Sequence, residues 1–199
     1  VNVVVLGGNV SGVTLDEDRS LAYVMDDTNG VHVVDISDPL SAQLVTTINP
    51  QFNNIGRGAR DVAVSPDGSL LYVTSYQGLS VHQISDLSNV EQLGFTVGGG
   101  YFGNVLLAGD VLLVCQDRNS GLLAYSLDIP DTPTLIGSYF DMVKDVALSH
   151  DGKEIYIAKG GTISFGSNAP GVVVCSLDAF LDVARNGSYS SDRTYEITS

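Results

Sequence analysis

Apolar residues along the chain gather in short runs, and turn-forming residues separate one run from the next. β-branched and aliphatic residues dominate these runs, as is typical of strands. Near-continuous runs such as Val31 to Ile36 and Val111 to Cys115 are typical of inner strands that are buried on both faces. Helical spacing of apolar residues appears only near Leu177 to Ala184. The pattern therefore predicts an all-β chain with one short surface helix in the segment LDAFLDVAR.

The apolar runs form four similar units, and each unit contains four predicted strands. The equivalent valines Val13, Val62, Val105 and Val146 lie 49, 43 and 41 residues apart. This spacing is typical of one four-stranded antiparallel sheet per repeat. The closing strands of the four units are predicted at 42–48, 90–97, 133–140 and 193–199.

A four-stranded sheet of this size cannot cover its own apolar faces. Sheets that stack face to face around a shared axis bury these faces and leave only short edges. The sequence therefore predicts a single β-propeller domain over residues 1–199, either a complete small propeller or part of a larger one. Residues 1–7 are expected to form the outer strand of a preceding or closing blade. The four blades are expected at 10–50, 58–99, 101–141 and 143–199, the last with an inserted loop and the short helix.

Loops between second and third strands, and loops that connect blades, are the expected places for a ligand site. Arg60 and Lys144 occupy equivalent positions directly before an Asp. They either hold an anionic ligand or pair with an Asp of a neighbouring blade and fix its orientation. The inserted loop 159–170 either hydrogen-bonds sugars or peptides or is a tolerated surface insertion. The ligand-binding candidates are Arg60, Tyr76, Arg118, Lys144 and Lys159; the same loops also contain Arg57, Asp26, Asp27, Tyr101, Phe102, Asp117 and Asp141.

No catalytic residue, metal site or cofactor is predicted. The acidic stretches at 16–18 and 26–27 match no calcium-loop spacing, so solvated turn carboxylates are the simpler interpretation. His32 and His82 are assigned to equivalent third-strand positions, and His150 lies in a turn. None of the three is beside a Ser or Cys nucleophile motif, and the chain contains no G-x-S-x-G, H-E-x-x-H or P-loop. A site assembled from several blades stays open as an alternative.

Acidic residues outnumber basic ones by 23 to 9, which gives a net charge of -14. This charge repels phosphate backbones and anionic lipid surfaces, and no apolar run is long enough to cross a bilayer. Nucleic acid binding and membrane insertion are therefore not expected. Asp, Ser, Asn and Thr dominate the polar residues over only three lysines, which is common in exported proteins. Cys115 and Cys175 lie in apolar strands, either as unpaired core thiols or as a pair between adjacent blades.

Two kinds of segment resemble known propeller repeats. GVHVVDISDPLSAQLV from Gly30 and GLLAYSLDIPDTPTLIGSY from Gly121 resemble the LVIVD repeat of bacterial and archaeal surface-associated propellers. SPDGSLLYVTSYQG from Ser65 and SHDGKEIYIAKG from Ser149 resemble the YVTN-type repeats of surface-layer proteins, and lactonase-type propellers share that phrase. The resemblance covers all four repeats. It implies a β-propeller fold and an extracytoplasmic, non-catalytic role, and it identifies no ligand.

Three hypotheses for function follow. The leading one is a non-catalytic binding or scaffold module of an extracellular or cell-surface protein. It would present loops to a protein or glycan partner, or pack in a larger assembly with further copies or the remainder of a longer chain. The alternative is a lactonase-like or other hydrolytic propeller with a site at the axial opening. The third is a homomeric structural element whose open fourth-strand edges pair between copies.

Overall fold

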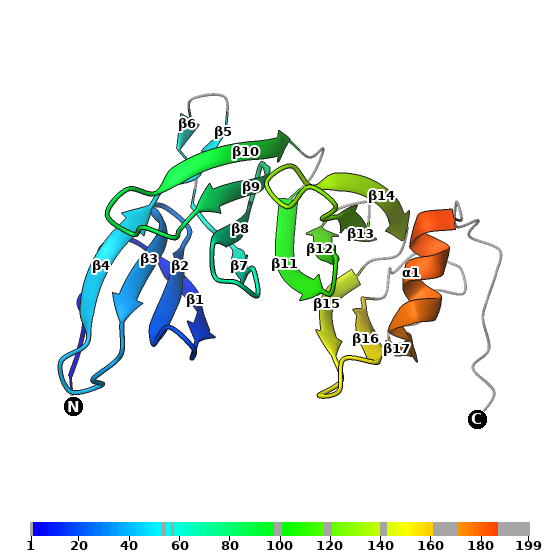
Figure 1. Cartoon of the computed structure of the whole chain (residues 1–199), viewed down its shortest axis with the longest axis horizontal. Helices are drawn as coiled ribbons and strands as arrows, with labels where there is room; N and C mark the ends of the chain where they lie inside the picture. The colour runs from blue at the N-terminus through cyan, green and yellow to red at the C-terminus, as the bar shows by residue number, and fades with distance from the viewer. Residues whose placement is uncertain are drawn as a thin grey trace. The chain divides into compact units, whose positions relative to one another are not determined.

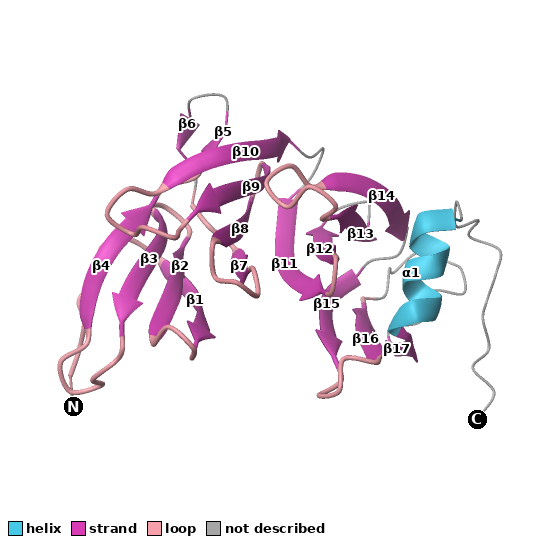
Figure 2. Ribbon diagram, in the orientation of Figure 1, coloured by secondary structure: helices cyan, strands magenta, loops and turns pink. Residues whose placement is uncertain are grey.

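The computed structural model forms strands that pair almost entirely within local antiparallel sheets (Figures 1 and 2). Within the described part of the chain there are three four-stranded sheets, one three-stranded sheet and one two-stranded hairpin. The chain divides into two compact units, Val1–Val105 and Leu106–Ser199, and each has its own hydrophobic core. The described residues are 2–52, 55–56, 58–97, 101–117, 121–139, 143–160 and 171–186.

The first two sheets have the same order of strands from first to last in sequence. Short turns join successive strands, so each sheet is a meander in which neighbours in sequence are neighbours in space. The first sheet consists of β1 (Val10–Asp16), β2 (Leu21–Asp26), β3 (Gly30–Asp35) and β4 (Gln43–Ile48). The second consists of β7 (Asp61–Val64), β8 (Leu70–Ser75), β9 (Gly78–Gln83) and β10 (Glu91–Val97).

The third and fourth sheets continue this pattern, and the boundary between the two units falls within the first strand of the third sheet. The third sheet consists of β11 (Tyr101–Ala108), β12 (Val111–Asp117), β13 (Gly121–Ser126) and β14 (Thr134–Tyr139). The fourth consists of β15 (Val143–Leu148), β16 (Glu154–Lys159) and β17 (Gly171–Ser176), and the helix α1 (Leu177–Asn186) follows directly. The predicted all-β repeat and the predicted short helix are confirmed.

The structure differs from the sequence predictions in two local features. Residues 2–9 lie outside any strand, so the strand expected in 1–7 is absent from its described part. The apolar alternation there is real, but a strand forms only where a ladder partner is available, and Asn2 reaches Ala42 through a side-chain bond instead (Nδ2 to O, 2.9 Å). The hairpin of β5 (Gln51–Phe52) and β6 (Ile55–Gly56) was not predicted. The fourth strand predicted at 193–199 lies outside the described residues.

The core of the first unit contains side chains from facing sides of its two large sheets. Tyr23, Val31 and Val33 come from β2 and β3, while Val62 and Val73 come from β7 and β8. We call the face that carries Tyr23 and its equivalents the leading face of a sheet. The face that carries Val62 and its equivalents is the trailing face. In this core a leading face packs on the next sheet's trailing face, and each fully buried aliphatic side chain contributes about 1.5–3 kcal/mol.

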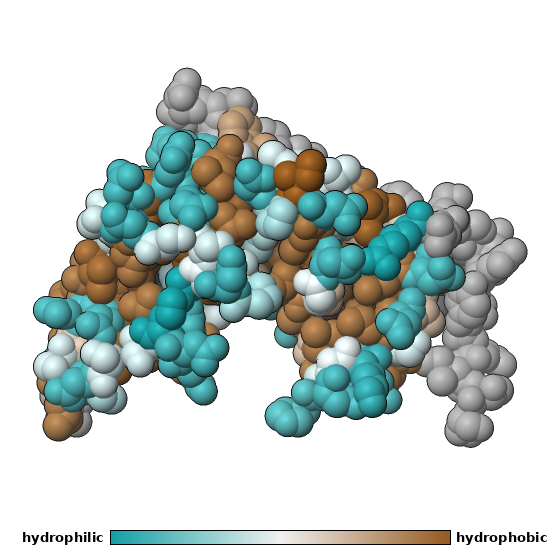
Figure 3. Space-filling view, in the orientation of Figure 1, coloured by the Kyte–Doolittle hydropathy of each residue, from teal (hydrophilic) through white to brown (hydrophobic). Residues whose placement is uncertain are grey.

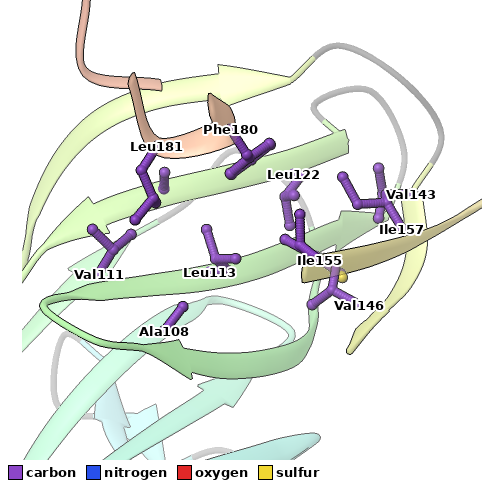
Figure 4. Close-up of a cluster of buried hydrophobic side chains, with 12 residues drawn as sticks. Ala108, Val111, Leu113, Leu122, Val143, Val146, Ile155, Ile157, Phe180 and Leu181 are labelled. Atoms are coloured by element: carbon purple, nitrogen blue, oxygen red, sulfur yellow. The ribbon is translucent and has the colours of Figure 1, made fainter. Parts of the chain in front are cut away.

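The core of the second unit repeats this arrangement. Leu113 and Leu122 of the third sheet and Ile155 and Ile157 of the fourth belong to one buried cluster. Helix α1 adds Phe180 and further apolar side chains to the same cluster (Figure 4). A leading face again contacts a trailing face, so the same interface occurs twice in the chain.

Helix α1 lies close to the sheets of the second unit at two points. A Cβ at Gly137 in β14 would overlap the backbone carbonyl of Ala184, so this close approach requires glycine. At the end of the helix, the Arg185 guanidinium donates to both carboxylate oxygens of Asp110 (2.8 and 3.0 Å). Among the described residues, no helix is long and apolar enough to cross a membrane.

Cys115 and Cys175 both contribute to the second core, and no disulfide joins them. Cys115 is buried in β12, whereas Cys175 is half-buried in β17. Burial raises the pKa of the Cys175 thiol, which therefore stays protonated at neutral pH. Of the two sequence interpretations, the one without a disulfide holds.

Candidate functional site

Two of the five candidates from the sequence, Arg60 and Tyr76, meet in the first unit. Arg60 lies directly before β7, and Tyr76 lies in the turn between β8 and β9. The Arg60 Nη1 donates to Asp27 Oδ1 (3.1 Å) and to the Tyr76 hydroxyl (3.0 Å). The guanidinium carbon also lies 4.9 Å from the centre of the Tyr76 ring, within the range of a cation–π interaction.

A second tyrosine extends this contact toward solvent. The Tyr101 ring lies edge-on to the Tyr76 ring, with centroids 5.0 Å apart and planes at 89°. Tyr76 is 41% exposed and Tyr101 is 37% exposed, so both rings present apolar surface to solvent while their mutual contact fixes their orientation. We call Asp27, Arg60, Tyr76 and Tyr101 the arginine–tyrosine cluster. All four were expected in loops, and only Arg60 and Tyr76 were ligand-binding candidates; Tyr101 instead begins β11.

The backbone around Arg60 is held by the first sheet on one side and by β8 of the second sheet on the other. The Ala59 amide donates to the carbonyl of Asp26 (2.9 Å), and the Arg60 amide donates to the carbonyl of Thr74 (2.8 Å). A Cβ at Gly58 would overlap the backbone of Asp27, so only glycine permits this approach. These contacts place Arg60 next to the preceding blade's Asp27. The pairing with a neighbouring Asp, one of the two roles inferred from the sequence, is therefore present.

Asp26, beside the cluster, is completely buried and anchors the turn that carries Asp27. Its carboxylate accepts bonds from the amides of Thr28 (2.7 Å) and Asn29 (2.9 Å) and lies 3.3 Å from His32 Nε2. Burial alone would raise the pKa of Asp26, but these donors outweigh it and lower the pKa to about 2. The interpretation of Asp26 as a solvated turn carboxylate is wrong, because the turn amides, rather than water, solvate it.

The Asp that follows Arg60 has a structural role. Asp61 Oδ1 accepts a bond from the amide of Val62 (2.9 Å), and its Oδ2 accepts one from Val105, the equivalent valine of the next repeat (2.9 Å). In the fourth sheet Asp145 Oδ1 likewise accepts a bond from the amide of Val146 (2.9 Å). The Arg-Asp and Lys-Asp pairs noticed in the sequence thus combine a surface cation with a carboxylate that fixes the start of a strand.

Lys144 and Lys159 lie together at one end of the fourth sheet. Val143 pairs with Lys159 and Asp145 pairs with Ala158, so Lys144 is the extra residue of a β-bulge beside Lys159. Lys144 is exposed and Lys159 is half-buried. They occupy the positions that Arg60 and the residue before Tyr76 occupy in the second sheet. Arg118, the remaining candidate, lies outside the described residues, as do 161–170 of the inserted loop.

The strand register corrects one equivalence inferred from the sequence. Gly30 pairs with the last residue of β2 and Gly78 with the last residue of β8, so His32 is equivalent to Ser80 and not to His82. His82 Nε2 lies 2.9 Å from Ser80 Oγ, and burial lowers the pKa of His82 to about 4. His82 is therefore a neutral core residue away from the cluster.

A concave region of about 480 Å³ at the turns that follow β1 and β7 is lined by groups that are paired with one another. Arg19 donates to Asp16 Oδ2 (2.7 Å) and also bonds the carbonyl of Gly68. In the second of these turns the Ser65 and Ser69 hydroxyls bond Asp67 (2.6 and 2.8 Å) and lower its pKa to about 2. In the described ranges, no group of three or more His, Cys, Asp or Glu side chains is arranged to hold a metal.

Comparison with known proteins identifies the repeat. Residues 7–49, which include the whole first sheet, match the family model of the LVIVD repeat. No curated protein gives a significant match to the chain.

Solved structures with similar folds include the β-propeller domain of Cps50 from Myceliophteria thermophila, with a TM-score of 0.60 and 8% identity over 78% of this chain and 50% of that one. A putative 6-phosphogluconolactonase from Bacteroides uniformis aligns with a TM-score of 0.61 and 14% identity over 81% of this chain and 51% of that one. Hydrazine synthase from Kuenenia stuttgartiensis aligns with a TM-score of 0.61 and 17% identity over 84% of this chain and 46% of that one. The chain spans about half the length of these structures. It therefore has a β-propeller fold, and its first sheet matches the LVIVD repeat.

Proposed function

We propose that this chain is a non-catalytic binding module of an extracellular or cell-surface protein, and that its arginine–tyrosine cluster binds an uncharged glycan. The observation that carries the proposal is the pair of half-exposed rings, Tyr76 and Tyr101, held at a fixed angle beside the Arg60 guanidinium. Ordered aromatic rings at the surface bind a partner with little loss of side-chain entropy.

The chemistry of the cluster fits a sugar ring. A sugar presents apolar C–H groups to an aromatic face and hydroxyl groups at its rim. Arg60 offers guanidinium donors, and Asp27 offers a carboxylate acceptor. The Arg60 charge is balanced by Asp27, and the chain carries a net charge of -14. An uncharged glycan therefore fits this site better than an anionic one.

A lactonase activity remains the competing proposal. The putative 6-phosphogluconolactonase from Bacteroides uniformis shares the fold at 14% identity, and unrelated functions commonly occur on one fold. Hydrolysis of a gluconolactone by the purified chain, followed by acid release at constant pH, would favour the enzyme over the binding module.

The binding proposal is tested with an array of neutral oligosaccharides probed with the purified chain. The double variant Tyr76→Ala/Tyr101→Ala is expected to lose at least tenfold in affinity for the glycans that the unmodified chain binds. Ile129→Ala is the control, because Ile129 is an apolar residue that is 62% exposed in the loop between β13 and β14, outside the cluster. An unmodified chain that binds none of the glycans, or a double variant that binds as well as the control, would reject the proposal.

A further inference from the structure

The trailing face of the first sheet is uncovered, although the same face is buried in the second sheet. Val13 is 60% exposed and Leu15 is 56% exposed, whereas Val62, the equivalent of Val13, is 3% exposed. The pairing registers establish this equivalence, because Val13 pairs with Val24 as Val62 pairs with Val73. Apolar surface is visible beside β3 and β4 of the same sheet in the space-filling view (Figure 3).

The leading face of the fourth sheet is uncovered in the same way. Tyr156 is 37% exposed and Val172 is 66% exposed. Their equivalents in the first sheet, Tyr23 and Val31, are completely buried at 0%. Aliphatic and aromatic side chains of this kind at a sheet face are rarely left to water in groups.

The two uncovered faces are the two halves of an interface that the chain already contains twice. In the first unit a leading face packs on a trailing face in one buried cluster, and the second unit contains the same type of contact. The surface that would cover the exposed face of the first sheet is therefore a leading face. The surface that would cover the exposed face of the fourth sheet is a trailing face.

We propose that a second copy of this chain supplies both, so that the leading face of the fourth sheet of one copy packs on the trailing face of the first sheet of another. The contact is a continuation of the interface in the two cores. The similar solved structures are about twice as long, so two copies together contain about as many residues as one of them. This inference is independent of the proposed glycan site.

The charge of the chain determines how this association responds to salt. Each copy carries a net charge of -14, so two copies repel each other at low ionic strength. The contact itself is apolar and is not weakened by screening. Association is therefore expected to strengthen as salt is raised from 0.05 to 0.5 M (on the order of a threefold fall in Debye length).

The test is the solution mass of the whole chain, measured by light scattering over a range of concentrations and at high salt. A mass of at least twice the 20.9 kDa of one chain is expected. Val13→Asp/Leu15→Asp and, separately, Val172→Asp should each reduce the mass to that of one chain. Leu40→Asp and Ile129→Asp are matched controls, because these loop residues are 77% and 62% exposed on neither face and should leave the mass unchanged.

Mixing the two variants separates this contact from any other. Val13→Asp/Leu15→Asp retains an intact leading face on its fourth sheet, and Val172→Asp retains an intact trailing face on its first. An equimolar mixture should therefore recover twice the mass of one chain. If copies associated through two identical faces instead, the mixture would not recover this mass. Thermal unfolding of each variant shows that it is folded. A single-chain mass for the unmodified protein at high concentration, or a folded mixture that stays at that mass, would overturn the proposal.

Discussion

The first and second sheets have the same strand order and share most of their apolar positions, yet they bury different polar groups. The register makes Asp26 equivalent to Ser75 and His32 equivalent to Ser80. In the first sheet the buried carboxylate of Asp26 accepts bonds from turn amides and lies beside His32. In the second sheet only hydroxyl groups occupy these two positions.

The difference shows which part of the repeat the fold requires. Most apolar side chains between sheets are shared because they form the cores, although Thr74 stands where the first sheet has Met25. The buried polar positions vary, provided that each group finds a partner, since an unsatisfied buried donor or acceptor is costly. The second sheet even places His82 where the first has Val34, and Ser80 provides its partner. Equivalent substitutions in the two sheets should therefore have unequal effects.

The largest difference is expected at the end of the second strands. Asp26→Ala leaves the amides of Thr28 and Asn29 and the His32 ring without their buried acceptor, so it should destabilise the protein by about 3–5 kcal/mol. Ser75→Ala removes weaker bonds, with a contact to Gln77 at 3.1 Å, and should cost about 1 kcal/mol. Urea-induced unfolding, followed by far-ultraviolet circular dichroism, measures both. Equal midpoints for the two variants would mean that the carboxylate is not the anchor of this turn.

The next effect is a dependence of stability on pH that comes from the second sheet. The pKa of His82 is lowered to about 4 in the folded protein, while an unfolded His has its ordinary value near 6.5. The unfolded chain therefore takes up the proton first, so stability is lost as pH falls from about 6.5 to about 4, by about 3 kcal/mol. His82→Val introduces the residue of the first sheet and should remove this loss. A variant with the same pH profile as the unmodified protein would contradict this prediction.

Asp26 titrates in a lower pH range than His82, so the contributions of these two groups can be separated experimentally. Its pKa in the folded protein is about 2, below the ordinary value near 3.9, so its contribution to stability is present above pH 4 and is lost as pH falls toward 2. The Asp67 carboxylate contributes in the same range. Asp26→Asn should reduce the slope of stability against pH only below pH 4.

The smallest effect is expected in the first turns of the two sheets. Ser20 has a φ of 52° in the first sheet, and Gly68 has a φ of 70° in the second. A left-handed conformation costs a residue other than glycine about 1–2 kcal/mol. Ser20→Gly should therefore raise the stability by up to about 1 kcal/mol, and Gly68→Ala should lower it by at least about 1 kcal/mol, because the new Cβ would also displace the Arg19 guanidinium. Stability is measured by thermal unfolding. If both variants were stabilised or both destabilised, side-chain contacts rather than the backbone conformation would determine the effect.

Most of the fold could be predicted because the repeated apolar positions are mainly those that the sheets bury. The equivalent valines and the Gly-flanked third strands mark inner strands, and the structure places β-strands there. The apolar stretch at residues 3–5 looked similar but forms no strand, since the sequence does not show whether a neighbouring strand is present. The two-residue error between His32 and His82 has another cause. It is a miscount of positions, because both third strands begin with glycine, Gly30 and Gly78, and counting from this residue already places His32 level with Ser80.

The candidate site was predicted in part. Arg60 and Tyr76 were found because they lie in loops at the expected end of the blades. The contact of Tyr76 with Tyr101 joins residues of different repeats and has no signature in either one. The burial of Asp26 was missed because an Asp after a strand usually faces water. The following Thr28 and Asn29, whose amides bond its carboxylate, are consistent with an Asx turn but do not establish burial.

The closing strands of the first three sheets share one irregularity, which affects how well their edges could pair with a further strand. The register shifts at Val45 in β4, at Leu93 in β10 and at Ile136 in β14, so each strand bulges at the same place. A bulge breaks the regular spacing of N–H and C=O groups and twists the strand, which makes it a poor template for a further strand. These edges are thereby poorer templates for amyloid-like growth than regular strand edges would be.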